Sequence, residues 1–471
     1  MSNNRRNFLK TTGLAGLGIA GGGLLQGFTS GPEAVKHKSR AGSIQTFNMC
    51  GYGAPKLETV RAGFIGLGSR GPGHVMNLTK IEGVQIVGLS DLLEEEVQKV
   101  NKRVTTLGHK PTLYSGAQDE WKKLCDRKDV DIIYISTPWH LHTPMALYAM
   151  EMGKHVFIEV PAAVTIEECW QLVETSERTK KHCMMLENTC YDFFELLTLN
   201  MARQGFFGEL VHAEGAYIHN LLDGNFSKTG YQDMWRLKEN ATRRGNLYPT
   251  HGLGPVCQAM DINRGDKLEY LNSLSSMDFQ MAAKAKELAS KDDFYKQFAD
   301  DTFRGNMNTT SIRTTRGRSI MIQHDVTSPR PYSRIHLISG TKGTALKYPE
   351  PGRISNSHNG WLSETEYKAV EEKYTPAIVK KVGELAKKVG GHGGMDFLMD
   401  WRVIDCLRNG LPLDQDVYDA ASWSSVFPLS EWSVNNRSNS IDVPDFTRGA
   451  WRSNKPLDID LKVGGTTGIN L

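Results

Sequence analysis

The segment from Val60 to Asp91 constrains the fold more than any other part of this 471-residue chain. An apolar strand runs into Gly66-Leu67-Gly68-Ser69-Arg70-Gly71, a helical pattern follows, and a second apolar strand ends at Asp91. Such glycines permit a tight turn, a close approach of the backbone to a pyrophosphate, and close packing of the helix on the sheet. Asp91 lies 20 residues after Gly71, where a carboxylate accepts ribose hydroxyls and repels a 2′-phosphate. The segment therefore predicts an NAD site, with a purely structural glycine turn as the alternative.

Apolar runs alternate with helical patterns as far as residue 187, which predicts a doubly wound parallel sheet. The expected strands cover 60–65, 84–90, 131–136, 155–159 and 182–187. After Tyr191, strands follow one another without helices between them, which favours an antiparallel sheet. The predicted fold is α/β: a Rossmann domain at 60–188, then an α+β domain with a mainly antiparallel open sheet and a C-terminal tail at 189–471. Within it, 364–390 is expected to form one exposed, charged helix.

The N-terminus carries Arg5-Arg6-Asn7-Phe8-Leu9-Lys10, followed by an apolar, glycine-rich stretch from Thr11 to Phe28. This pattern predicts a twin-arginine export signal at 1–30 and a linker at 31–59, with a frayed amphipathic helix as the alternative. The expected location is periplasmic, and the expected partner is the twin-arginine export machinery. Because that route carries folded proteins, a cofactor loaded beforehand would stay bound. The stretch is a marginal bilayer helix, so we expect no stable membrane span in the mature protein.

Composition excludes several classes of function. With 39% hydrophobic and 23% charged residues, the chain has the composition of a soluble globular protein. The net charge of +3 is spread along the chain, so the sequence does not indicate a basic surface that would bind nucleic acid. The seven cysteines form no C-x-x-C pair and are interpreted as small buried apolar residues. No histidine or carboxylate spacing predicts a metal site.

Polar segments follow several expected strands, where a doubly wound sheet places its ligands. They are Trp139, His140, Leu141 and His142 after 131–136, Glu159 and Val160 after 155–159, and Asn188 after 182–187. A further segment, Tyr248-Pro249-Thr250-His251, opens a helix in the second domain. As a histidine, His251 suits proton transfer, and Tyr248 is close enough in sequence to share a proton with it.

These motifs resemble the glucose-fructose oxidoreductase/inositol dehydrogenase superfamily and, more narrowly, glycoside hydrolase family 109, the NAD-dependent α-N-acetylgalactosaminidases. Trp235-Arg236 and the glycine-rich run 390–396 add to the resemblance, which covers nearly the whole chain. The dehydrogenases of the superfamily usually carry a lysine where this chain has Val160, and an aspartate where it has Leu247. Ordinary alcohol oxidation is therefore disfavoured, and both departures match the hydrolase branch.

The resemblance implies a redox cycle with a tightly bound, recycled NAD. NAD takes a hydride from C3 of the sugar, a base removes the acidified C2 proton, and the C1 substituent leaves. Water then adds and the hydride returns to C3, which gives net hydrolysis with retention. Such a cycle needs no pair of carboxylates flanking the glycosidic bond.

The matched motifs also imply roles for individual residues. The cofactor-binding set is Gly66, Gly68, Ser69, Arg70, Asp91, Trp139, His140, Leu141, His142, Glu159, Val160, Asn188 and Tyr248. The substrate-binding set is Tyr217, Arg236, Tyr248, Pro249, Thr250, His251 and Tyr332, of which His251 and Tyr248 are catalytic. Each of these roles has a purely structural alternative. His140 and His142 could serve in packing, Arg236 could form a stacked surface pair with Trp235, and Tyr332 could anchor a loop. The histidine of the glycine-rich run is interpreted as part of a turn.

Three functions therefore stay open at this point. The leading one is an exported glycosidase acting on terminal α-N-acetylgalactosamine, with a glycoside as substrate. The second is an exported NAD(P)-dependent sugar oxidoreductase of the same superfamily, and the third is a non-catalytic sugar-binding protein. The resemblance further implies a homo-oligomer that pairs through the outer face of the second sheet.

Overall fold

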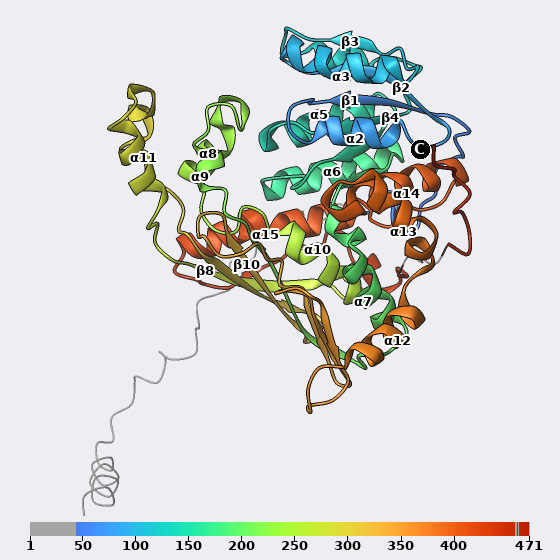
Figure 1. Ribbon diagram of the computed structural model, residues 1–471, viewed down its shortest axis with the longest axis vertical. Coiled ribbons are helices and arrows are strands. Elements are labelled where there is room, and N and C mark those ends of the chain that lie inside the picture. The colour runs from blue at the N-terminus through green and yellow to red at the C-terminus, as the bar shows by residue number, and fades with distance from the viewer. Residues whose placement is uncertain (1–43, 457–458, 460, 471) are drawn as a thin grey trace, which may run out of the picture. The chain divides into compact units, whose positions relative to one another are not determined.

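The computed structural model describes residues 44–456, 459 and 461–470, and within them it contains two β-sheets (Figure 1). The export signal predicted at 1–30 lies outside the described residues. None of the helices in the described ranges has both the length and the apolar character needed to cross a bilayer. The described part of the expected linker packs on the body of the protein, where Met49 is 3% exposed and donates its N–H to the Tyr418 hydroxyl.

The first sheet has six parallel strands in the order β3-β2-β1-β4-β5-β6, which is the order of dinucleotide-binding sheets. The strands are β1 (Val60–Ile65), β2 (Val84–Ser90), β3 (Thr112–Tyr114), β4 (Ile132–Ile135), β5 (His155–Ile158) and β6 (Cys183–Met185). The helices between them are α2 (Gly71–Leu78), α3 (Glu94–Thr106), α4 (Glu120–Cys125), α5 (Trp139–Glu151) and α6 (Ile166–Thr179). The predicted Rossmann sheet is confirmed. Only β3 was not predicted, because this short, partly exposed edge strand has no apolar run.

The second sheet has the order β13-β12-β11-β7-β10-β9-β8-β14. Its strands are β7 (Leu210–Ile218), β8 (Leu268–Ser275), β9 (Asn308–Thr314), β10 (Ser319–Asp325), β11 (Leu337–Gly340), β12 (Thr344–Leu346), β13 (Arg353–Ser355) and β14 (Ile441–Asp442). β7 and β10 pair in parallel, and the other pairs are antiparallel. In β9 every second residue is buried, as expected for a sheet with one covered face. The predicted α+β region with a mainly antiparallel sheet is confirmed.

The remaining helices follow β6 in the chain. They are η1 (Asn188–Tyr191), α7 (Phe193–Arg203), α8 (Leu222–Asn225), η2 (Gln232–Met234), α9 (Trp235–Thr242), α10 (Thr250–Ala259), α11 (Met281–Ala289), η3 (Asp293–Phe298), α12 (Glu364–Tyr374), α13 (Ala377–Val389), η4 (His392–Gly394), α14 (Met395–Asn409), α15 (Val417–Asn435) and η5 (Ala450–Arg452). Among them α10 packs on β7 of the second sheet, and α14 packs on α2 beside the first sheet. Helix α15 packs on α6 and β6 on one side and on β8 on the other, so it lies between the two sheets (Figure 1). Its residues are buried on nearly all faces, as expected for a helix enclosed by protein.

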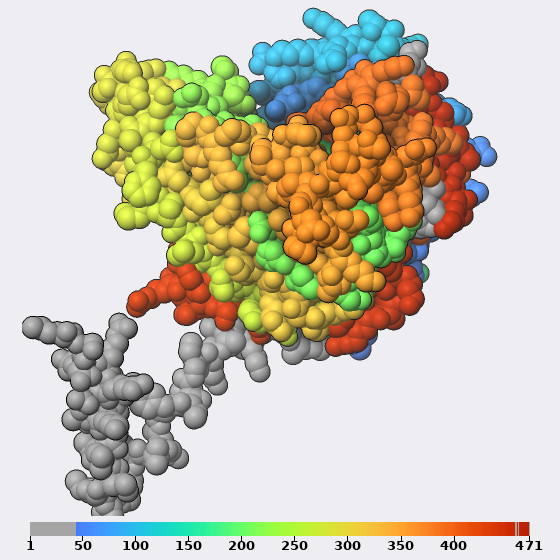
Figure 2. Space-filling model, turned by 60° about the horizontal axis from the view of Figure 1, so that its bottom comes forward, coloured from blue at the N-terminus to red at the C-terminus, as the bar shows by residue number. Residues whose placement is uncertain are grey.

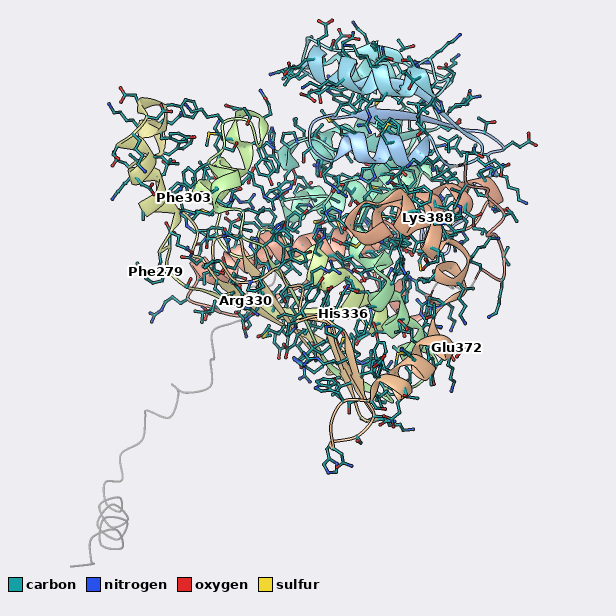
Figure 3. The ribbon with its side chains drawn as sticks, viewed as in Figure 1. Phe279, Phe303, Arg330, His336, Glu372 and Lys388 are labelled. Carbon is teal, nitrogen blue, oxygen red and sulfur yellow. The ribbon has the colours of Figure 1, made fainter. Side chains whose placement is uncertain are left out.

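The prediction of a single helix at 364–390 is wrong. The structure has two helices, α12 and α13, because Pro376 follows the end of the first and cannot continue its hydrogen bonds. Helix α13 is also not simply exposed, since Ile378, Val382 and Ala386 are buried. Figure 3 labels Glu372 on α12 and Lys388 on α13, on the opposite side of the view from Phe279, which precedes α11.

Candidate active site

The glycine turn between β1 and α2 has the backbone shape that a dinucleotide requires. Gly66 has φ of +91°, and a Cβ on it would lie 2.6 Å from the Ser136 carbonyl oxygen. A Cβ on Gly71 would lie 1.9 Å from the Gly66 oxygen, so both glycines are needed for packing. A Cβ on Gly68 would have no atom within 4 Å, and Gly68 and Ser69 are exposed at the start of α2. The open space at Gly68, before a helix N-terminus, fits a pyrophosphate.

Asp91 lies at the end of β2 beside this turn. Its Oδ2 accepts the Leu67 N–H at 2.6 Å, and its Oδ1 accepts the Leu93 N–H at 2.9 Å. Each carboxylate oxygen has further acceptor capacity, so the two amides orient Asp91 without using up its ability to accept ribose hydroxyls. The turn and Asp91 together fit the adenosine and pyrophosphate parts of NAD.

A network of buried charges lies beyond the turn. The Arg70 guanidinium donates to Glu159 Oε1 at 3.0 Å and to Asp396 Oδ2 at 3.1 Å. His74 donates from Nε2 to Glu159 Oε1 at 2.9 Å and from Nδ1 to Asp400 at 3.0 Å. Burial lowers the pKa of His74, but Asp400 and Glu159 outweigh burial and raise it to about 10. His74 is therefore an imidazolium, which agrees with both ring nitrogens acting as donors.

This network ties α2 and the end of β5 to α14, a helix that follows more than 200 residues later in the chain. On α14, Asp396 accepts from Asn188 Nδ2 at 2.5 Å and from His392 Nδ1 at 2.8 Å. Burial raises the pKa of Asp396, but His392 and Arg70 outweigh burial and hold it well below its usual range. His392, interpreted from the sequence as part of a turn, is thus in contact with the cofactor-binding set.

The second cluster is built around His251, in the first turn of α10. Its Nδ1 donates to Glu187 Oε1 at 2.7 Å, and Thr189 Oγ1 donates to the same oxygen at 2.6 Å. Glu187 is fully buried; burial raises its pKa, but His251 and the hydrogen bonds outweigh burial and lower it, so it is ionised. Within the described ranges, His251 Nε2 makes no hydrogen bond. A carboxylate that fixes one ring nitrogen leaves the other positioned for proton transfer.

Aromatic rings surround this histidine. The Tyr248 ring lies 4.9 Å from that of His251 and 4.5 Å from that of Tyr217. The ring of Trp139, at the start of α5 beside the first sheet, lies 5.9 Å from that of Tyr248, so residues of both regions meet here. The Arg236 guanidinium lies 4.9 Å from the Tyr248 ring, and Arg236 is 8% exposed. Its Nη1 donates to the Tyr231 hydroxyl at 3.1 Å, whereas its buried Nη2 has no hydrogen-bond partner among the described residues, so this end of the guanidinium is available for an oxygen of a ligand.

Other residues predicted for the site have different surroundings. His142 is 1% exposed, and its ring nitrogens face the carbonyl oxygens of Thr137 and Pro161, each at 2.8 Å. Burial lowers the pKa of His142, and a neutral ring donates to only one of these two carbonyl oxygens. His140 is exposed, whereas Val160, Pro249 and Thr250 are buried and Leu141 is partly buried. Tyr332 is 39% exposed, with its ring 6.4 Å from that of Tyr217.

Sequence reasoning missed several residues of these two clusters. Glu187 directly precedes Asn188 after β6, so the rule that singled out Asn188 could also have found it. His74 and Asp400 lie inside helices and meet only because α14 packs on α2, which no local pattern signals. No group of three or more histidine, cysteine or acidic side chains in the described part of the chain could hold a metal ion.

Comparisons with known proteins agree with this geometry. A family model described as glycosyl hydrolase 109, C-terminal domain, matches residues 191–453, and one described as oxidoreductase family, NAD-binding Rossmann fold, matches residues 60–187. A glycosyl hydrolase family 109 protein of Shewanella pealeana is 49% identical over 467 residues, covering 98% of this chain and 99% of the relative. A family 109 protein of Bacteroides fragilis is 49% identical over 425 residues, covering 87% and 89%. The chain belongs to glycosyl hydrolase family 109.

Solved structures show the fold of this family 109 chain. A levoglucosan dehydrogenase in complex with NADH and L-sorbose has a TM-score of 0.62 at 16% identity, covering 83% of this chain and all of that one. An aldose-aldose oxidoreductase of Caulobacter crescentus, complexed with glycerol, has a TM-score of 0.58 at 15% identity, covering 82% and 99%. At such identities the likeness concerns the fold alone, and the NAD-binding domain is supported by the family model.

The glycine turn generates a paired prediction. Gly68→Ala adds a methyl group to the open space at the turn, so we expect NAD to bind about tenfold more weakly (~1.4 kcal/mol) with no change in Tm of the NAD-free protein. Gly71→Ala forces a methyl group against backbone and should lower that Tm by several degrees. Calorimetric titration with NAD and thermal unfolding check the pair; unchanged NAD affinity in Gly68→Ala would contradict the assignment of this space.

His74 generates a prediction about pH. Its folded pKa of about 10 exceeds the unfolded value of roughly 6.5, so the folded state holds the extra proton between these values. The stability from this group is fully present below about pH 6.5 and is lost as the pH rises through about 10. We expect the free energy of unfolding to fall more steeply over this window in the wild type than in His74→Gln. Urea titrations at several pH values check this, and parallel curves for the two proteins would refute it.

Proposed function

We propose that this family 109 chain is an exported glycosidase that removes terminal α-linked N-acetylgalactosamine with net retention, by an NAD-dependent cycle. The observation that carries the proposal is the pair of the buried Glu187 and the partly exposed His251, beside Tyr248 and next to the NAD-binding sheet. The paired arginines and apolar stretch near the N-terminus support export to the periplasm.

The site contains residues that can bind NAD and keep it bound. The turn at 66–71 and Asp91 would hold the adenosine and pyrophosphate, and Trp139 and Asn188 would line the nicotinamide half. When bound, NAD would supply the oxidation at C3 of the sugar and its later reversal, so no second substrate is needed. The network that joins Arg70, Glu159 and Asp396 lies beside this region, and its ion pairs support a cofactor that stays bound between turnovers.

The chain's own residues move the protons. Once C3 is a ketone, the C2 hydrogen is acidic, and His251 Nε2 removes it while Glu187 stabilises the imidazolium. The electron pair of the C2–H bond forms the C1=C2 double bond, and the C1–O bond breaks with its electron pair on the leaving oxygen, which takes a proton from the water that adds at C1. Burial raises the pKa of Tyr248 well above its usual value, so its hydroxyl stays protonated and can donate a hydrogen bond to the sugar. Water then adds at C1, and His251 returns a proton to C2.

The charge pairing supports this route over ordinary acid–base hydrolysis. A carboxylate pair that flanks the glycosidic bond needs one protonated and one free member. Here Glu187, Glu159 and Asp396 are each paired with a cationic or imidazole group, and the pKa of each is lowered. The buried Arg236 Nη2, which has no hydrogen-bond partner among the described residues, supports recognition of a carbonyl oxygen such as that of an acetamide.

A sugar oxidoreductase is the second candidate. The fold shared with the dehydrogenases favours it, whereas Val160, buried at 3% where such enzymes usually carry a lysine, does not. A non-catalytic sugar-binding protein is the third candidate, and it retains the fold without the proton chemistry.

Solvent exchange tests the proposed function. Purified protein incubated with p-nitrophenyl α-N-acetylgalactosaminide in deuterated water, without added NAD, should release nitrophenol and a sugar with deuterium at C2, because the C2 proton is exchanged in the cycle. Mass spectrometry of the sugar checks the label. Hydrolysis without exchange would rule out elimination, accumulation of reduced cofactor with an oxidised sugar would favour the oxidoreductase, and no turnover despite bound NAD would favour the binding protein.

Glu187 generates a separate prediction. Glu187→Gln keeps the shape of the side chain but removes the charge that stabilises the His251 imidazolium, so kcat should fall by roughly 10²–10⁴. His251→Ala should abolish turnover while NAD stays bound. Steady-state kinetics with measured NAD content and Tm check both variants, with Glu371→Gln, on the exposed face of α12, as a matched control. Wild-type kcat in Glu187→Gln would contradict the role of the pair.

A further inference from the structure

A cavity of about 360 Å³ lies beside the aromatic cluster, and its walls come from segments far apart in the sequence. Asp192 and Phe193 lie at the start of α7, Tyr332 and Tyr348 flank β11 and β12, and His392 precedes α14. The volume is at the low end of the roughly 300–1,000 Å³ found for small-molecule pockets, which suits a group of about the size of one sugar residue. Figure 2 shows that the surface is also hollowed between the yellow-green segment around α8 and α11 and the blue segment of the first sheet.

The cavity adjoins the proposed catalytic cluster but is not the same space. Of the residues predicted to bind substrate, only Tyr332 lines it. The Tyr332 ring lies 6.4 Å from that of Tyr217, which in turn lies 5.4 Å from that of His251. On the other side His392 is bonded to Asp396, which also holds Asn188. A group attached to a sugar held at Tyr217 and His251 therefore reaches the cavity past Tyr332.

One buried cation fixes two walls of the cavity. Arg334 is 3% exposed and donates to Asp192 Oδ2 and to Glu195 Oε1, each at 2.6 Å. It also donates to the Tyr332 hydroxyl at 3.3 Å, and its guanidinium lies 5.5 Å from the centre of the Tyr348 ring. Both tyrosines are thus held in place before any ligand arrives, which reduces the ordering cost of binding.

The lining has the chemistry of a site for a neutral sugar. The rings of Phe193, Tyr332 and Tyr348 offer apolar faces for C–H groups, and the carboxylates of Asp192 and Glu350 accept hydroxyl hydrogens. Arg334 and Lys347 both pair with Asp192 and Glu195, so two cations are balanced by two carboxylates, and the exposed Glu350 then makes the cavity unfavourable for anionic groups such as sulfate.

We propose that this cavity binds the neutral sugar residue to which the terminal sugar is linked, so that the enzyme recognises its leaving group. The proposal rests on the glycosidase function and adds a second sugar subsite to it. Tyr348 and Glu350 are specificity residues of this subsite, since they line the cavity and lie outside the catalytic cluster.

Two substrates with the same terminal sugar test the proposal. One is methyl α-N-acetylgalactosaminide, whose leaving group cannot fill the cavity, and the other has the same sugar α-linked to galactose. We expect the wild type to show a higher kcat/KM for the disaccharide. In Tyr348→Ala and Glu350→Gln, KM for the disaccharide should rise about tenfold (~1.4 kcal/mol), while the constants for the methyl glycoside stay within about twofold.

Matched controls are Tyr270→Ala on β8 and Glu364→Gln on α12, which are both exposed and lie outside the cavity lining. Tm and NAD content establish that each variant is folded, and Glu350→Gln, at an exposed position, keeps the test valid if Tyr348→Ala fails to fold. Equal effects on both substrates, or equal kcat/KM for both in the wild type, would overturn the subsite while leaving the glycosidase function intact.

If the wild type hydrolyses neither glycoside, the proposed glycosidase function is wrong. The proposed subsite is then tested separately, by calorimetric titration of the protein with the same disaccharide. Binding that is about tenfold weaker in Glu350→Gln than in Glu364→Gln supports the subsite. Equal affinity in the two variants, or no binding by the wild type, overturns it.

Discussion

The ion network of Arg70, His74, Glu159, Asp396 and Asp400, in which only Arg70 is partly exposed, is the interaction on which the site depends. It joins the loop after β1, the end of β5 and the helix α14, so that residues far apart in the chain form one edge of the site. Removing charges from water is costly, and such a network is favourable only when each group is paired. Loss of one partner would leave an uncompensated charge beside the cofactor-binding turn.

The two clusters divide the chemistry of the site between them. The network and the glycine turn form the side that suits a dinucleotide, whereas Glu187, His251 and Tyr248 form the side that suits proton transfer. Trp139 connects them, because it begins α5 at the edge of the first sheet and contacts Tyr248 from the second region. Neither region alone contains a complete site.

Much of the fold could be predicted from the sequence because its signals are local. Glycine spacing defines the turn at 66–71, and runs of apolar residues mark the strands of the first sheet. The edge strand β3 lacks such a run, and the break at Pro376 was overlooked within a continuous charged pattern. The parallel pairing of β7 with β10 depends on long-range packing, which no local pattern records.

The site was predicted less completely, for a related reason. Residues at strand ends, such as Glu159 and Asn188, follow from the topology of parallel sheets. His74, Asp400 and Arg334 acquire their partners only when distant helices and loops meet, and their charges are balanced by residues that sequence spacing cannot pair. Resemblance to a known family supplied Tyr217, Arg236 and Tyr332, which local patterns alone do not single out.

The central claim is that one bound NAD is used and restored within each hydrolytic turnover. A glycoside carrying deuterium at C3 tests it most directly, with mass spectrometry of the released sugar after many turnovers of the protein as purified. We expect a released sugar that keeps deuterium at C3 together with slower turnover than that of the unlabelled glycoside, because the C3–H bond is broken and remade in each cycle. Loss of the label from C3 during hydrolysis would contradict it.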